Sequence, residues 1–104
     1  MEVVTMDYIK GKRIKEVKGM VSGSIVLTRS MFTDIASSFK TIFGGELKGY
    51  TKLMENAHKK ATLKLMDEAR KVNANAVVST RISTTSIMQG ATEIRIYGTA
   101  VLVD

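Results

Sequence analysis

Residues 50–72 carry one apolar stripe at helical spacing, and just beyond them the pattern changes to the alternation of a strand. The stripe continues for about six turns, and its members are Tyr50, Leu53, Met54, Ala57, Ala61, Leu65, Ala69 and Val72. Asn73 is the predicted end of this helix, because asparagine tolerates the left-handed conformation common there. A long helix with one apolar face that leads directly into strands must bury that face against a sheet.

The segment from Arg13 to Leu27 alternates in the way a half-buried strand does. One face holds Val17, Gly19, Val21, Gly23, Ile25 and Leu27, and the other holds Glu16, Lys18, Ser22 and Ser24. Gly19 and Gly23 lie on the inward face. They predict a β-bulge, or a place where a helix or another backbone comes close.

The N-terminal part of the chain supplies a short strand and a first helix. Residues 3–5 read as the strand, and Gly11 marks a turn in the connection that follows. Ser30 caps the predicted helix, whose apolar residues recur at helical spacing. Gly44 and Gly45 stop that helix, because glycine readily adopts the left-handed conformation.

Residues 76–88 and 91–103 read as two strands joined by a hairpin at Gln89-Gly90. After the short first strand, the predicted order is therefore β-α-α-β-β. We expect one α+β domain over residues 1–104, a two-layer sandwich with an antiparallel sheet and helices on one face.

One helical layer leaves the other face of the sheet open. That face carries hydroxyls and charges, but also Tyr97, Val101 and Val103, and the chain has seven methionines. A domain this small often completes its burial by self-association. The expected partner is the protein itself, in a closed ring of identical subunits.

The composition excludes several kinds of chemistry. The chain has no cysteine, so disulfides, thiolate catalysis and sulfur-based zinc sites are absent. We find no nucleophile–base pair, carboxylate dyad or cofactor motif, and expect neither an enzyme nor a cofactor. The N-terminal residues lack a signal-peptide pattern and no apolar run approaches a membrane span, so we expect a cytoplasmic protein with no membrane partner.

The net charge of +6 favours polyanions in general without specifying one. A basic group near the N-terminus surrounds Tyr8 and comprises Lys10, Lys12, Arg13, Lys15 and Lys18. These cations could contact nucleic-acid phosphates, but the chain has few aromatics and no stacking motif. Nucleic acid is therefore the third reading and not the expected partner.

His58 and Glu68 are the two candidate ligand residues on the long helix. His58 is the only histidine, and Glu55 is the only reasonable metal ligand within one helical turn of it. It reads as a half-buried structural residue, or as a metal ligand shared across a ring axis. Glu68 falls inside the apolar stripe on a helical wheel, so its carboxylate needs a partner. That partner is Lys64 or a group across a subunit interface, or else Glu68 forms a ligand or cation site at an interface.

The junction between the two helices holds the other candidate ligand-binding residues, Gly44, Gly45 and Tyr50. The glycines follow a helix instead of a strand, and no Gly-Lys-Ser/Thr follows them, so a P-loop is not supported. A helix end and tight connection is the simpler interpretation. The backbone amides at the start of the long helix could nevertheless hold an anion.

The chain resembles the YbjQ-like family of small bacterial and archaeal proteins, which carries a heavy-metal-binding label. The matching residues are Ile9, Gly11, Ile14, Glu16, Gly19, Val21-Ser22-Gly23, Gly44-Gly45, Tyr50, Glu68-Ala69, Ala74-Asn75-Ala76-Val77-Val78 and Gly98-Thr99-Ala100-Val101. The resemblance implies a dodecin-like subunit in a homopentamer, with no established activity.

Two departures from the family pattern bear on the metal. Asn73 stands where a glycine is expected, which is compatible with the same helix end. Residues 79–84 read Ser-Thr-Arg-Ile-Ser-Thr where relatives tend to carry acids, which weakens metal binding for this member. We therefore predict a homopentameric structural or small-ligand-binding protein, with heavy-metal binding as the alternative and a small ligand or metal ion at the interfaces.

Overall fold

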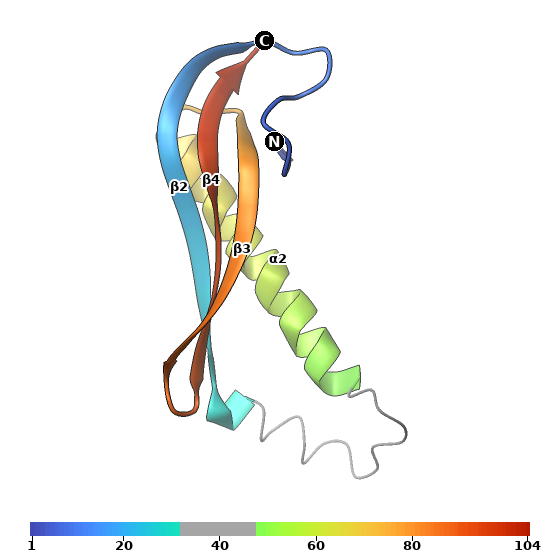
Figure 1. Cartoon of the computed structure of the whole chain (residues 1–104), viewed down its shortest axis with the longest axis vertical. Coiled ribbons are helices and arrows are strands. Elements are labelled where there is room, and N and C mark those ends of the chain that lie inside the picture. Colours follow the sequence, from blue (N-terminus) through green and yellow to red (C-terminus); the bar gives the residue numbers. More distant parts are fainter. Residues whose placement is uncertain (32–47) are drawn as a thin grey trace.

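The computed structural model describes residues 1–31 and 48–104 of the chain. Its elements are β1 (Glu2–Val3), β2 (Ile14–Thr28), α2 (Lys48–Lys71), β3 (Ala76–Met88) and β4 (Ala91–Val103). The strands form one sheet in the order β1-β3-β4-β2, in which β1 is parallel to β3 and the other pairs are antiparallel. Figure 1 shows α2 on one face of this twisted sheet. The predicted α+β class is confirmed for these residues.

The core between α2 and the sheet is built from small helical residues. Ala57, Ala61, Leu65 and Ala69 are at most 3% exposed. They pack mainly on β2 and β4 and only slightly on β3, against the apolar residues Val21, Leu27, Val77, Ile94, Ile96 and Ala100. The helical stripe predicted from the sequence therefore faces the sheet, as its spacing requires.

The two inward glycines of β2 have the two roles predicted for them. The pairing of β2 with β4 shifts between Val17 and Gly19, where Gly19 adopts a φ of +121°. This bulge carries Val17 to the opposite face, where its side chain is 64% exposed. The expectation that Val17 shares the inward face is therefore wrong. Gly23 instead lies directly under the backbone of α2 at Ala61 and Leu65.

The end of α2 follows from one residue with positive φ. Asn73 has a φ of 62°, its N–H donates to the carbonyl of Arg70, and the N–H of Ala74 donates to the carbonyl of Ala69. This pair of bonds is a Schellman motif. Ala74 and Ala69 then join the same core cluster, so the chain enters β3 with its register fixed.

The sheet face opposite α2 is only partly open, which corrects the expectation from the sequence. The N-terminal segment lies along β3, where Val4 N–H donates to the Val77 carbonyl and Thr80 N–H donates to the Val4 carbonyl. Its apolar side chains cover one end of that face. They form a second core with Val78, Val101 and Val103, so the last two valines are buried. Tyr97 remains 38% exposed.

The other predicted elements compare simply with the structure. The short first strand is Glu2–Val3 instead of residues 3–5, and the turn at Gly11 is present with a φ of +79°. The β3–β4 hairpin turns at Gln89-Gly90, as predicted. Of the predicted first helix, the structure describes only residues 29–31, which are already helical from Arg29, so Ser30 is not the residue that precedes the helix. The rest of this helix lies outside the described residues.

Candidate functional site

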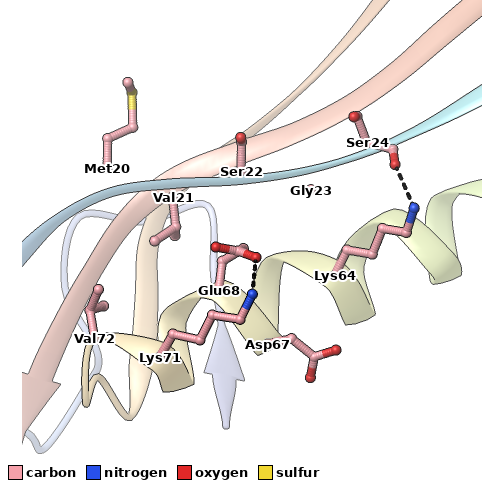
Figure 2. Close-up of a pocket in the computed structure, with 10 residues that line it drawn as sticks. All are labelled: Met20, Val21, Ser22, Gly23, Ser24, Lys64, Asp67, Glu68, Lys71 and Val72. Atoms are coloured by element: carbon pink, nitrogen blue, oxygen red, sulfur yellow. Dashed lines mark hydrogen bonds and ion pairs between the residues drawn. The ribbon is translucent and has the colours of Figure 1, made fainter.

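An open groove runs between the outer edge of β2 and the C-terminal half of α2 (Figure 2). Its volume is about 790 Å³. The strand wall is made of Met20 to Ser24, and the helix wall is made of Lys64, Asp67, Glu68, Lys71 and Val72. We call it the β2–α2 groove. Gly23, one of its lining residues, lets α2 lie close to β2, because a Cβ atom there would meet the backbone of the helix.

The helix wall is charged and largely self-paired. Lys71 Nζ lies 2.8 Å from Glu68 Oε1, and Arg70, just outside the groove, lies 3.1 Å from Asp67. Lys64 makes a different contact, because its Nζ donates to the backbone carbonyl of Ser24 at 3.3 Å. Figure 2 shows this bond spanning the groove from helix to strand. No carboxylate of the described residues forms a salt bridge with Lys64 in the structure.

The ion pair in the groove raises the pKa of one of its two members, Lys71. The hydrogen bond that the Lys71 ammonium donates to the Glu68 carboxylate, and then the negative charge of that carboxylate, raise the pKa of Lys71 above the ordinary value of 10.5. The ammonium group is therefore charged at physiological pH. Both side chains remain in contact with solvent, at 69% and 48% exposed, so the pair contributes little to stability.

Of the partners considered for Glu68, Lys64 is not the one found within the subunit, because the carboxylate pairs with Lys71 instead. Glu68 does lie on the side of the helix given by the wheel, but there it lines the open groove instead of the packed core. Val72, one turn later, is exposed to 39% for the same reason. The carboxylate thus faces the groove and pairs with Lys71 along the helix.

Of the remaining predicted ligand residues that the structure describes, neither His58 nor Tyr50 lines this groove. His58 is partly buried on α2, and its backbone carbonyl accepts a hydrogen bond from the Thr62 hydroxyl at 2.8 Å. Tyr50 is partly buried near the start of α2. Gly44 and Gly45 lie outside the described residues. The groove therefore brings Glu68 together with two lysines and a strand edge, and not with His58 or Tyr50.

The described residues of one chain do not fit a heavy-metal site. The chain has no cysteine and one histidine, and no three His, Cys, Asp or Glu residues gather within the described ranges. Thiolate and imidazole are the ligands that such metals prefer. Glu68 faces lysines, which disfavours a cation beside it. One subunit therefore supplies no complete ligand set from residues 1–31 and 48–104.

The basic group near the N-terminus is partly neutralised. Lys12 pairs with Glu2 at 3.0 Å, Arg13 with Asp104 at 3.1 Å, and Lys18 with Glu16 at 3.0 Å. Three of its cations therefore have carboxylate partners, which weakens the case for a surface dedicated to phosphates. Separately, none of the helices in the described residues is long and apolar enough to cross a membrane.

Sequence reasoning missed the strand wall of the groove. The alternation of β2 places Ser22 and Ser24 on its polar face, but nothing in that alternation shows that this strand is the edge of the sheet. A compositional signal was present, because residues 20–28 contain no charged side chain. Edge strands that remain exposed usually carry lysine or another protective residue.

The same architecture occurs in a solved crystal structure. A protein of unknown function of the DUF74 family from Pediococcus pentosaceus superposes with a TM-score of 0.68 at 16% identity, over 100% of this chain and 98% of that one. At this identity the likeness concerns the fold alone.

Sequence comparison identifies the family. Relatives named UPF0145 protein include one from Thermosipho melanesiensis, 50% identical over 97% of this chain and 94% of the relative, and one from Thermotoga maritima, 44% identical over 100% and 98%. The family model YbjQ_1, described as "Putative heavy-metal-binding", matches residues 1–104. The chain therefore belongs to the YbjQ family, over its whole length.

Proposed function

We propose that this protein is a homo-oligomeric structural or small-ligand-binding protein that performs no catalysis of its own. Its subunits form a closed ring, a pentamer of dodecin-like subunits, in the cytoplasm. Any ligand would be held at the interfaces or along the ring axis, where residues from several copies meet. The family resemblance suggests the ring size, and the shape of the subunit supports the association.

The observation that carries this proposal is an excess of exposed surface. The chain of 11.4 kDa exposes 7006 Å², whereas a compact monomer of that mass exposes roughly 5,800 Å². Its radius of gyration is 16.7 Å, against roughly 13 Å for a compact domain of this length. The excess of roughly 1,200 Å² approaches what one subunit buries in two standard interfaces.

Apolar side chains are prominent on that surface. Exposed fractions reach 82% for Met20, 65% for Met88 and 55% for Ile82. Scattered exposed apolar residues are ordinary in monomers, but these three lie on or beside the two long strands β2 and β3. Burial between copies would remove their apolar area from water, at about 25 cal/mol per Å².

Native mass spectrometry of untagged protein, purified without added metal or nucleotide, tests the proposal. We expect a ring of five subunits. A stoichiometric extra mass on that ring would identify the class of ligand, and a bare ring would favour a structural role. A monomer at every concentration examined would overturn the proposal.

Heavy-metal binding is the alternative function, supported by the description of the family model. In this chain it requires a site shared between copies, such as His58 residues brought together around a ring axis. Metal-free protein should then gain thermal stability from stoichiometric divalent metal, and His58→Ala should abolish the gain. An unchanged melting temperature with Zn²⁺, Cu²⁺, Ni²⁺ and Cd²⁺ would eliminate this function.

A further inference from the structure

Within the described residues, the sheet has two edges whose outward backbone groups have no partner strand, and the two edges lie level with each other along the strand direction. The N-terminal segment pairs with β3 only as far as Thr80, so residues 82–88 have no neighbour on that side among the described residues. On the opposite side of the sheet, β2 is the edge strand. The position of each edge can be read from β4, because Gly23 and Ile82 both lie opposite Ile96, and Ser24 and Ser83 both lie opposite Arg95.

Both edges lack the protection that exposed strands normally carry. Residues 20–28 and 82–92 contain no charged side chain and no proline, although 25% of the chain is charged. Exposed edges of this length invite pairing with another strand, and monomers prevent it with charges, prolines or short strands. Two unprotected edges on one sheet therefore indicate that strands cover them in the native assembly.

Along β2, the backbone N–H and C=O groups point alternately toward β4 and away from it, and the strand register shows which residues point away. The Val101 carbonyl accepts from Asn75 on the β3 side, so the alternate residues Gly98, Ile96 and Ile94 face β2. Their partners in β2 are Val21, Gly23 and Ile25. The backbone N–H and C=O groups of Ser22, Ser24 and Val26 therefore point away from β4. The hydrogen bond that Lys64 donates to the Ser24 carbonyl independently shows this direction for Ser24.

The outward backbone groups of β3 match those of β2 in spacing, and the two strands run in the same direction. Ser83 and Arg81 face β4, so the backbone groups of Ile82, Thr84 and Ser86 point outward. Since β2 and β3 are both antiparallel to β4, they run in the same direction. A β3 edge placed beside a β2 edge in parallel keeps α2 of both copies on the same face. Because the two edges lie level, copies that pair edge to edge are related by a rotation with no translation along the axis. Repeating such a rotation closes a ring.

From these relationships we infer that residues 82–86 of one copy pair in parallel with residues 23–27 of the next copy, along the β2–α2 groove, so that Ser83 lies beside Ser24. The inference rests on the proposed self-association and names its interface. Ile82, Thr84 and Ser86 of the incoming copy have side chains on the helix side of the sheet. They would therefore enter the groove, where Ile82 meets the stems of Lys64 and Glu68. The incoming backbone would replace the Lys64 ammonium at the Ser24 carbonyl.

A cysteine pair tests this interface directly, because the chain has no cysteine of its own. In the double variant Ser24→Cys/Ser83→Cys, the two positions are separated within one subunit by two strand spacings, about 9.6 Å. That separation is too long for a disulfide, whereas neighbours across the proposed interface are about 4.8 Å apart. Mild oxidation should yield disulfide-linked dimers, trimers and larger oligomers up to the full ring, which a non-reducing denaturing gel resolves. The control Ser24→Cys/Thr84→Cys places its thiols on opposite faces and should yield none.

A mixing experiment separates this interface from a symmetric pairing of two β2 edges. Ser22→Pro removes an outward N–H from one edge and Thr84→Pro removes one from the other, at positions where proline is tolerated. Each variant alone should be monomeric, and an equimolar mixture should form heterodimers only. Circular dichroism spectra matching the unmodified protein confirm that the variants fold.

The outcomes distinguish this inference from the broader proposal. If the unmodified protein is oligomeric but no disulfide-linked oligomers form and the proline variants stay assembled, the interface lies elsewhere and this inference is overturned alone. If Thr84→Pro still dimerises while Ser22→Pro does not, the two β2 edges pair with each other and the inference is again overturned. If the unmodified protein is monomeric, both proposals fall.

Discussion

Gly23 lies against the carbonyl oxygen of Ala61, so closely that a Cβ atom at position 23 would collide with it and with the backbone nitrogen of Leu65. These are backbone atoms of a helix, which cannot move aside as the end of a flexible side chain can. The contact sets the distance between α2 and β2, and with it the width of the β2–α2 groove.

Gly23→Ala is therefore expected to destabilise the protein by about 3 kcal/mol or more, because the added methyl group must push α2 away from the sheet. Chemical denaturation measures this change. Ser22→Ala, the matched control, alters the opposite face and should change stability by less than about 0.5 kcal/mol. Equal effects at the two positions would mean that the helix does not lie against Gly23.

Leu65 and Leu63 offer a second matched comparison on one helix. Leu65 is fully buried and Leu63 is 59% exposed. Leu65→Ala should cost about 3 kcal/mol, because it removes buried apolar surface and leaves a cavity. Leu63→Ala should cost less than about 0.5 kcal/mol. A large loss at Leu63 would instead reveal a surface that is buried between copies.

Asn73 determines the end of α2 through its φ of 62°. Asn73→Gly should preserve or slightly raise the melting temperature, because glycine adopts this conformation without a steric penalty. Asn73→Val should lower stability by about 1–2 kcal/mol, because a β-branched residue is strained there. Thermal unfolding of the two variants checks the order, and a valine variant as stable as the glycine variant would contradict it.

Thr80 is 7% exposed, and its hydroxyl has no hydrogen-bond partner among the described residues. Thr80→Val keeps the shape and removes the unsatisfied group. We expect stability to be unchanged or to rise by about 1 kcal/mol. Thr80→Ser keeps the hydroxyl, loses a methyl group and should be less stable than the valine variant. A clear loss in Thr80→Val would show that the hydroxyl is bonded, for example to a water molecule.

Glu68→Gln should lower the pKa of Lys71 toward its ordinary value of 10.5, because the variant lacks the charge that stabilises the ammonium group. Since the pKa is raised in the folded state, the pair favours folding below the unfolded pKa and this contribution disappears as pH rises through the folded pKa. NMR titration of the lysine side chains measures the shift. Asp67→Asn, the control, should lower the pKa less, and an unchanged Lys71 titration in Glu68→Gln would exclude the ion pair.

The parts of the fold that follow from local pattern were predictable from the sequence. The helical stripe, the hairpin at Gln89-Gly90 and the helix end at Asn73 each depend on neighbouring residues and backbone preference. The roles of Gly19 and Gly23 were also indicated, although not which glycine had which role. That distinction depends on where α2 crosses β2, which is a property of the whole sheet.

The remaining features depend on contacts between distant segments. Residues 4–9 show no period, so nothing in them indicates that they cover Val101 and Val103. The helical wheel gave the correct direction for Glu68, but direction does not tell whether a strand lies opposite or the sheet has already ended. The bulge that turns Val17 outward likewise interrupts an alternation that looks regular in the sequence.

The buried side of α2 consists largely of alanines, at positions 57, 61 and 69, so the helix rests on the sheet almost backbone to backbone. A contact surface of this kind adjusts poorly, because the side chain of alanine has no alternative rotamer that could absorb a substitution opposite it. Evolutionary drift there is confined to changes of about one methyl group, while the solvent side of the same helix can diverge freely. Descendants of this chain should therefore differ widely in surface chemistry while keeping the same spacing between helix and sheet.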